Sequence, residues 1–337
     1  MVFKKKKVEV KKTEHEKLEE RREEVLAQGR KFKYPLQYAK HRVVFITIIV
    51  IMAVLAALVV GGWLALYKFN SANNTLYKIT QFLPVSVAKV DGESVKFSDY
   101  LMIYKSSLNA VEQQAEYQNN GTDLEMMKEE YRRTALTQAE DYAYALKLGK
   151  ELGVEVNDEQ IMAMFENHRK AGGTLRSEES FLKILQDNFG MTKTEYKRML
   201  YLSIMKAEVE QEIDEEANAL ANRVEQMLAA NGGNYEKTAT DMAGDVIYDS
   251  TDGLVDSKNI DGGRATMAMA LEKGAQSGRF VSSNGDGYYF IKVLDKTDTQ
   301  VSYVSLKVPF TEFGSRLAKI RTDGLVDEFI TFREQEE

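Results

Sequence analysis

An uncharged apolar run of 25 residues, positions 43–67, constrains this chain more than any other feature. It reads VVFITIIVIMAVLAALVVGGWLALY and lies between Arg42 and Lys68. At about 1.5 Å per residue, a helix of this length crosses a hydrocarbon layer about 30 Å thick. The 42-residue basic segment before the run, and the lack of a clean Ala-x-Ala site after it, argue against a cleaved signal peptide. We therefore predict an uncleaved transmembrane signal anchor over residues 43–67.

The charges on either side of this run predict its orientation. Residues 1–42 hold 14 Lys and Arg against 7 Asp and Glu, whereas residues 69–337 hold 30 against 45. Because basic flanks are retained in the cytoplasm, we expect a single-pass protein of the cell membrane with a cytoplasmic tail and an extracytoplasmic body. The expected anchors in the lipid headgroups are Tyr38, Trp63 and Tyr67. The acidic body makes nucleic acid an improbable partner.

Small residues recur every four positions in the run, at Ala53, Ala57, Gly61 and Ala65. Such a stripe lets two membrane helices approach closely, although an alanine-rich segment also produces this spacing by chance. A homodimer through the span is therefore one open alternative.

The composition excludes several kinds of site. The chain has no cysteine, so disulfides, thiolate metal sites and lipid-modified cysteines are impossible. Its three histidines, His15, His41 and His168, lie far apart in the sequence, which leaves little for a zinc site or a Ser-His-Asp triad. Apolar neighbours at helical spacing mark His168 as a packing or surface residue, and no titratable partner is evident nearby. No phosphate-binding GxxxxGK loop occurs, and we expect no cofactor or metal.

The remaining pattern predicts an α+β fold. Asp91-Gly92 separates two β-type runs and favours a type I′ hairpin. Ser98 is the expected N-cap of the next helix, and capping boxes at Asn157 and Thr192 start later helices. From residue 215 helices alternate with short strands, and a last helix is expected over residues 314–332. The division is a basic tail (1–42), the anchor (43–67), a linker (68–84), a helical domain with an N-terminal hairpin (85–214), a small α+β domain (215–310) and a C-terminal helix (311–337).

Several segments, in this order, carry a family resemblance over about residues 85–310. They are VAKVDGESV, LGVEVNDEQI and DNFGMTKTEYKRML in the first half, and GGNYEKTATDM, MAMALEKGAQSGRFVSS and DGYYFIKVLDK in the second. The chain resembles the SurA/PrsA-type membrane-anchored or periplasmic foldases. The resemblance implies a hairpin-plus-helices domain that holds unfolded exported proteins, followed by a parvulin-like domain that isomerises X-Pro bonds.

The second half departs from the active parvulin pattern that the resemblance implies. The opening strand with its histidine is missing, because MKAEVEQEIDEE at that place has a helical pattern. The strand VSYVSLKV could complete the sheet from the end of the domain, in a permuted order. Ser305 and Tyr289 would then stand at the two histidine positions, and neither side chain reproduces an imidazole pair near pH 7. We therefore expect a degenerate domain with weak or no isomerase activity.

These features favour a non-catalytic holdase for unfolded or nascent exported polypeptides. Twelve methionines lie between Met102 and Met269, and methionine suits surfaces that accept many partners, although most of them would equally fill helix cores. The candidate client-binding residues are Met162, Phe165, Phe189, Met191 and Met199. The alternatives are a parvulin-type isomerase with unusual residues and a bitopic scaffold protein of the envelope.

Overall fold

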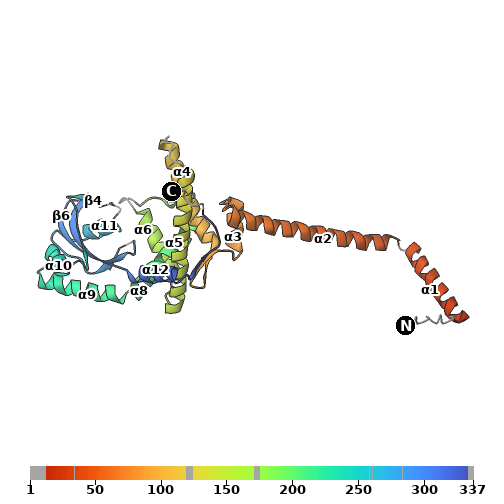
Figure 1. Cartoon of the computed structure of the whole chain (residues 1–337). Helices are drawn as coiled ribbons and strands as arrows, with labels where there is room; N and C mark the ends of the chain where they lie inside the picture. Colours follow the sequence, from red (N-terminus) through yellow and green to blue (C-terminus); the bar gives the residue numbers. More distant parts are fainter. Residues whose placement is uncertain are drawn as a thin grey trace, which may run out of the picture. The chain divides into compact units, whose positions relative to one another are not determined.

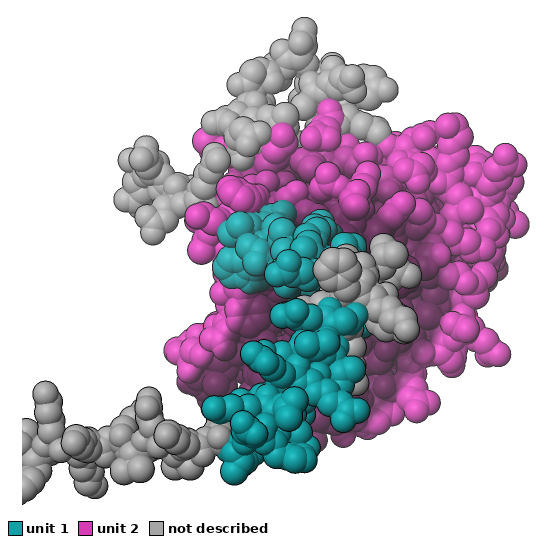
Figure 2. All heavy atoms as spheres, turned by 90° about the vertical axis from the view of Figure 1, so that its right-hand side faces the viewer, with its two compact units in different colours: residues 1–65 teal, residues 66–337 magenta. Residues whose placement is uncertain are grey.

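The computed structural model describes residues 13–33, 35–118, 124–170, 175–257, 259, 261–282 and 284–332. The chain divides into two compact units, Met1–Ala65 and Leu66–Glu337, which Figure 2 colours separately. The described part of the first unit is helical, and that of the second combines helices with two sheets (Figure 1). The predicted α+β class is confirmed.

The first unit holds the predicted anchor. Its helices are α1 (Glu14–Lys33) and α2 (Pro35–Trp63), and a π-helical turn, η1 (Leu64–Lys68), continues α2 into the second unit. Within the described residues, His41–Lys68 is the one helix long and apolar enough to cross a membrane, and its apolar stretch is not buried. Ala53, Ala57 and Gly61 are exposed along α2, so the structure leaves the small-residue stripe open without showing what covers it. Topology and dimerisation stay predictions.

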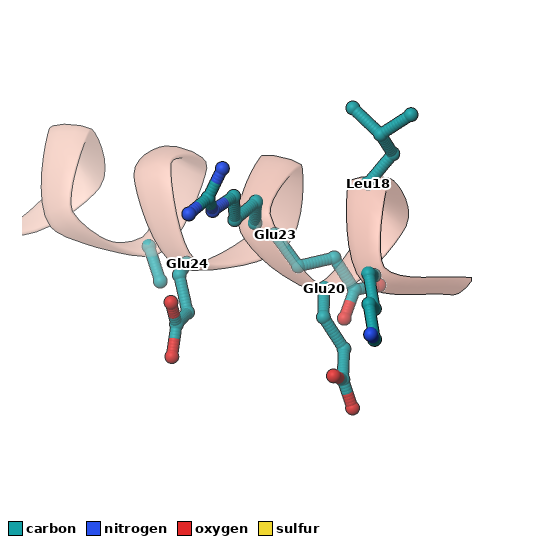
Figure 3. Close-up of a pocket in the computed structure, with 7 residues that line it drawn as sticks. Leu18, Glu20, Glu23 and Glu24 are labelled. Carbon is teal, nitrogen blue, oxygen red and sulfur yellow. The ribbon is translucent and has the colours of Figure 1, made fainter. Parts of the chain in front are cut away.

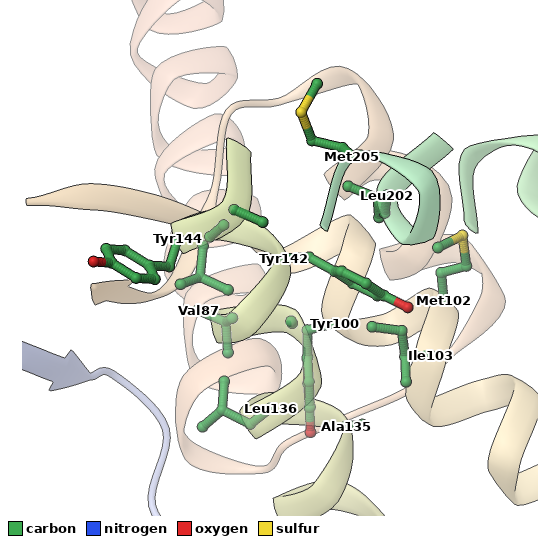
Figure 4. Packing of buried hydrophobic residues seen from close by; sticks show 14 of the residues in the cluster. Val87, Tyr100, Met102, Ile103, Ala135, Leu136, Tyr142, Tyr144, Leu202 and Met205 are labelled. Atoms are coloured by element: carbon green, nitrogen blue, oxygen red, sulfur yellow. The ribbon is translucent and has the colours of Figure 1, made fainter. Parts of the chain in front are cut away.

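The second unit begins with a hairpin and helices that share one core. These elements are α3 (Asn74–Phe82), β1 (Ser86–Val90), β2 (Glu93–Lys96), α4 (Phe97–Gln118), α5 (Leu124–Leu152), α6 (Asp158–Arg169), α7 (Glu178–Phe189) and α8 (Lys193–Ile213). Their inward side chains pack together as Figure 4 shows, with Val87 from β1, Tyr100 from α4, Leu136 from α5 and Leu202 from α8. Apolar residues at three- and four-residue spacing produce this packing.

Local sequence signals place most of these elements. Asp91 and Gly92 have φ of 48° and 80°, so the predicted hairpin turn is confirmed. Both predicted capping boxes form, from Asn157 to Gln160 and from Thr192 to Glu195. The prediction of Ser98 as an N-cap is wrong, because α4 already begins at Phe97.

The segment expected to be a linker, residues 68–84, contains helix α3. Asn73 caps it by accepting a hydrogen bond from the Thr75 backbone N–H at 2.8 Å. The linker interpretation rested on polar composition, but a nine-residue helix needs few apolar side chains when only one face is buried. Tyr77 and Thr80 supply that face.

Residues 215–310 form a second layered region, which we call the sheet module. Its elements are α9 (Glu215–Ala230), α10 (Tyr235–Asp241), β3 (Ile247–Ser250), β4 (Val255–Asp256), α11 (Arg264–Met269), β5 (Phe280–Val281), β6 (Gly287–Lys296) and β7 (Gln300–Pro309). Among the described residues the strand order is β3-β7-β6-β5, with β4 also pairing with β7. Side chains alternate along the strands, so Phe290 and Leu306 pack against α9 and α10 while Ile291 and Tyr303 pack against α11.

The chain then returns to the first core. Helix α12 (Glu312–Thr322) and strand β8 (Val326–Glu328) follow the sheet module, and β8 pairs antiparallel with β1. The expected last helix over 314–332 is therefore too long, because Gly324, with φ of 71°, turns the chain into a strand. Phe313, Leu317 and Ile330 are buried in the same core as the earlier helices. We call residues 66–213 together with 311–332 the helical domain.

Candidate functional site

A groove of about 980 Å³ opens on the helical domain. Three parts of the fold form it: α3 with the residues that follow it, the junction of β2 with α4, and the corner between α7 and α8. Its lining residues are Asn74, Tyr77, Lys78, Thr80, Gln81, Phe82, Leu83, Pro84, Lys96, Ser98, Asp99, Met102, Lys105, Gln186, Gly190, Thr192, Thr194, Glu195 and Arg198. The groove therefore joins segments that are more than 100 residues apart in the sequence.

Helix α3 gives one side of the groove an apolar edge. Tyr77 and Thr80 face the core, and the Thr80 hydroxyl donates to the Tyr77 carbonyl at 2.7 Å. Phe82, at the end of the helix, is 88% exposed, and Leu83 beside it is also exposed. Large apolar side chains in this position carry a hydration cost that a bound apolar partner would remove.

An ion pair joins two of the walls. The Arg198 guanidinium on α8 donates to the Asp99 carboxylate on α4, from Nε at 3.1 Å and from Nη2 at 2.7 Å. Such a two-point contact fixes both side chains geometrically. It also means that these charges are already balanced before any ligand arrives.

A second polar group lies around Glu195 at the start of α8. Burial pushes the pKa of Glu195 upward, but hydrogen bonds from the Thr192 hydroxyl and backbone, with help from Tyr77 and Lys105, outweigh burial and hold that pKa below its usual value. Burial lowers the pKa of Lys105, and the charge of Glu195 opposes this shift. The Lys105 ammonium also lies 5.1 Å from the centre of the Tyr77 ring and donates to the Asn74 side chain.

This arrangement suits the binding of a partly apolar ligand. The groove combines an apolar rim with the paired charges of Asp99 and Arg198, Lys78 and Lys96 also line it, and neither cysteine nor histidine does. Across the described part of the chain, no group of three or more histidine, aspartate or glutamate side chains is arranged to hold a metal ion.

The five candidate client-binding residues from the sequence fall into three environments. Phe165 and Met191 are buried in the core, and Met162 and Met199 are half-buried against it. Phe189, at the end of α7, is 41% exposed. A client contact stays a prediction for all five, and it is most accessible at Phe189.

Sequence reasoning missed the apolar edge of the groove. Phe82 and Leu83 lay inside the presumed linker, where isolated apolar residues attract no attention. The signal that was available is the spacing of Ile79 and Phe82, three apart on the side of the helix opposite Tyr77.

The positions equated with the parvulin histidines lie together on the sheet module. Strands β6 and β7 pair antiparallel, with Tyr289 opposite Lys307 and Ile291 opposite Ser305, so Tyr289 and Ser305 share one face. The Tyr289 hydroxyl donates to the Asp286 carboxylate at 3.1 and 3.2 Å. Ser305 is buried, and its hydroxyl has no hydrogen-bond partner within the described residues.

Asp286 organises this polar cluster. It pairs with the Lys307 ammonium and accepts a hydrogen bond from the Ser282 hydroxyl at 2.6 Å. Burial raises the pKa of Asp286, but Lys307 and Ser282 outweigh it and hold the pKa below its usual value. The cluster therefore has an ionised carboxylate that engages Tyr289, Lys307 and Ser282 at once. A correspondence to a parvulin site stays a prediction.

His168 has a partner that the sequence did not reveal. Its Nδ1 lies 2.5 Å from the Tyr196 hydroxyl, and the Tyr196 ring in turn packs against the rings of Phe165 and Phe181. Burial lowers the pKa of His168 and raises the pKa of Tyr196 to about 12. The predicted packing position among apolar neighbours fits this environment, but the 28-residue separation hid the tyrosine.

A shallow hollow on the first unit is not a comparable site. Residues of α1 alone line it, between Lys17 and Ala27. Leu18, Glu20, Glu23 and Glu24 project from a single helix in Figure 3. A ligand would therefore meet only one wall.

Comparison with known proteins adds a family to this geometry. A search of curated proteins finds no match for the chain. The family model described as the SurA-like N-terminal domain matches residues 36–209, just over half of the 337 residues, and this range includes every residue that lines the groove. The chain belongs to the SurA-like N-terminal domain family, a family of chaperone domains.

Proposed function

We propose that this protein is a membrane-anchored extracytoplasmic holdase that binds unfolded or nascent exported polypeptides in the groove of its helical domain. The observation that carries this proposal is the open groove itself, which lies wholly inside the segment that matches the SurA-like family. The acidic body, the basic tail and the apolar helix between them support an extracytoplasmic position for the groove.

The groove has the properties that transient binding of unfolded chains requires. Its volume lies at the upper end of the range for ligand sites, about 300–1,000 Å³, which is enough for a few residues of an extended segment. Phe82, Leu83 and Pro84 offer apolar contact without a fixed hydrogen-bond pattern. The Asp99–Arg198 pair is satisfied internally, so the site imposes no single partner charge. Tethering to the membrane would raise the local concentration for chains that emerge there.

A tryptophan placed in the groove tests this function. Thr194 is exposed, lines the groove from the first turn of α8 and lies away from the buried core. We expect Thr194→Trp to fill part of the groove and to weaken client binding several-fold without unfolding the domain. The measurement is suppression of aggregation of a chemically denatured client by the complete protein in detergent micelles.

The matched control is Thr240→Trp, on the exposed side of α10 in the sheet module. It makes the same substitution far from the groove and should leave suppression unchanged. Equal suppression by both variants would remove the groove from the proposal. A lack of suppression by the unaltered protein at several-fold excess would count against a holdase altogether.

The polar cluster of the sheet module supports weak or no prolyl isomerase activity. The barrier to X-Pro rotation is near 20 kcal/mol, and a catalyst must stabilise the twisted amide. Tyr289, Asp286 and Lys307 already satisfy one another, which leaves few hydrogen bonds for a substrate. A scaffold role remains the structural alternative. Crosslinking in membranes distinguishes it, because a scaffold yields one defined partner and a holdase yields many.

A further inference from the structure

The beginning of the second unit exposes apolar side chains beyond those that a groove needs. Phe69 is 68% exposed, Phe82 is 88% exposed, and Ile79 and Leu83 are each about half exposed. All four lie within 16 residues of the end of the predicted span. Isolated exposed apolar residues are common, but a set concentrated in one short segment indicates a partner surface.

Helix α3 presents these side chains in an ordered way. At 100° per residue, Thr75, Lys78, Ile79 and Phe82 occupy one face, and Tyr77 and Thr80 occupy the opposite one. Tyr77 and Thr80 are buried, whereas the whole first set is exposed. The helix is therefore fixed to the protein by one side and turns a partly apolar side outward.

The end of the apolar helix is built into the same unit, which holds α3 close to it. Leu66 is buried in the core, and the Tyr67 ring meets Phe97 edge-on at 5.6 Å. The Tyr67 hydroxyl donates to the Ser86 carbonyl at 2.8 Å, four residues after Phe82. Tyr67, expected as a lipid anchor, thus also ties the helix end to the first strand of the domain.

The chain length sets a limit on where α3 can lie. Only residues 69–73 separate Lys68 from the first residue of α3, and they span at most about 18 Å when fully extended. Asn70 within them is held by a hydrogen bond from its side-chain amide to the Thr331 carbonyl at 2.8 Å. If the apolar helix ends at a membrane surface, α3 must lie near that surface.

The charges of the segment match a lipid surface. The body from residue 69 onward carries 30 basic and 45 acidic residues, yet residues 68–84 contain Lys68 and Lys78 and no Asp or Glu. Aromatic residues with lysines are typical of the interface between hydrocarbon and headgroups, and anionic headgroups attract such lysines.

We propose that α3 lies in the membrane–water interface on the extracytoplasmic side, with Phe69, Ile79, Phe82 and Leu83 inserted among the lipid headgroups. This inference rests on the proposed membrane anchoring and deepens it. Because Phe82 and Leu83 also form the apolar edge of the groove, the groove then opens at the lipid surface. Clients are met where they leave the membrane, and lipid covers the edge when no client is bound.

Fluorescence quenching in vesicles tests the placement. Trp63 is the only tryptophan of the chain, so Trp63→Phe gives a background without tryptophan. We expect Phe82→Trp in this background, in the full-length protein reconstituted into vesicles, to be quenched by lipids brominated near the top of their acyl chains. The matched control is Leu294→Trp, because Leu294 is 43% exposed on β6 of the sheet module.

The expected result is quenching at least twofold stronger at position 82 than at position 294, and Ile79→Trp should repeat it. Equal quenching at the three positions would overturn the placement, as would a Phe82→Trp variant whose fluorescence responds only to an added denatured client. Quenching of Trp63 in the unaltered protein shows whether a negative result contradicts only the placement of α3 or the membrane anchoring as well. If brominated lipids quench Trp63 but not the Phe82→Trp variant, the anchor holds and this inference fails. If neither is quenched, the proposed anchoring fails as well.

Discussion

The helical domain and the sheet module differ in how the segments that form their cores are spaced along the sequence. The sheet module is built from one continuous stretch of the sequence. Its central hairpin joins β6 to β7 through three residues, and its helices cover both faces of the sheet. The helical domain is built from two separate stretches of the sequence. Helix α12 and strand β8, which follow the sheet module in the chain, complete the core that the earlier helices begin. The region with the open groove thus depends on contacts between segments far apart in the sequence.

Under the proposed function, this difference assigns client recognition to the helical domain and structural support to the sheet module. The sheet module pairs Asp286 with Lys307 and packs apolar residues against both faces of its sheet, which leaves it suited to bracing. The helical domain leaves apolar side chains exposed beside a groove and depends on a returning segment for stability. Perturbing the returning segment should therefore affect the groove far more than the sheet module.

The largest expected effect comes from Phe313→Ala. Phe313 on α12 is buried, with its ring 5.3 Å from that of Tyr144. Removing a buried phenylalanine side chain costs about 3–5 kcal/mol, so we expect the helical domain to unfold at clearly lower denaturant. Equilibrium urea unfolding, followed by circular dichroism and by proteolysis of each region, measures this change.

Phe290→Ala is the matched variant in the sheet module, where Phe290 is equally buried. It should lower the stability of the sheet module and leave the helical transition in place. A single shared transition that both variants shift equally would contradict the division of the unit into two regions.

The next effect concerns Asp214, where the two regions join. Its carboxylate accepts from the Ala217 backbone N–H at 2.9 Å, and from those of Thr311 and Glu312 at 2.7 and 3.0 Å. One side chain thus caps both α9 and α12. Hydrogen bonds to a charged group contribute about 1.5–3 kcal/mol net, so Asp214→Ala should cost about 2–3 kcal/mol and speed hydrogen exchange at residues 217, 311 and 312.

Asp298→Ala, in the exposed turn between β6 and β7, controls for the loss of a charge. It should change stability little. If Asp214→Ala speeds exchange at Ala217 only, Asp214 caps α9 and does not join the two regions.

A smaller effect, dependent on pH, is expected at Glu140 in the core of the helical domain. Burial raises its pKa to about 7, against the opposing hydrogen bond from Arg321 at 3.2 Å. The folded state therefore holds the proton more tightly than the unfolded chain, whose glutamate pKa is about 4.3. The resulting stabilisation is complete at low pH and is lost as the pH rises through about 7.

Glu140→Gln removes this titration. We expect the helical domain of the variant to lose less stability than the unaltered protein between pH 5 and pH 8, by about 1.4 kcal/mol for each pH unit between 5 and about 7. Urea unfolding across this range measures it, with Glu155→Gln on the exposed surface as the control. An unchanged pH profile would show that Glu140 is not the titrating group.

The sequence predicted what depends on local signals. The hairpin at Asp91-Gly92 and the capping boxes at Asn157 and Thr192 follow from residues three or fewer positions apart. The apolar run gave the candidate membrane helix for the same reason. The motifs of the first half gave the SurA-like family, which the match over residues 36–209 confirms, and the parvulin-like second half stays a prediction.

The groove was not predictable because no local pattern defines it. Asp99 and Arg198 meet across 99 positions, and α3 was hidden in a polar segment with one buried face. The return of β8 to β1 depends on a strand of three residues, and such short strands carry almost no periodicity. The methionine content indicated client-binding residues on the helices, but one of these candidates, Met191, is buried.

The smallest expected effect tests the sheet module as support. Tyr289→Phe removes a hydroxyl that donates to Asp286, and a typical hydrogen bond contributes about 0.5–1.5 kcal/mol net. Lys307 and Ser282 continue to satisfy the Asp286 carboxylate, so we expect a stability loss at the low end of this range. We also expect no change in the turnover of a proline tetrapeptide, which we propose to be weak or absent, measured beside an active parvulin. Ser305→Ala removes the buried hydroxyl that has no partner within the described residues and should be neutral or slightly stabilising.

If the unaltered protein turns over the peptide at the rate of an active parvulin, and either variant abolishes this turnover, then the two regions do not divide into recognition and support, because the sheet module would be catalytic in its own right.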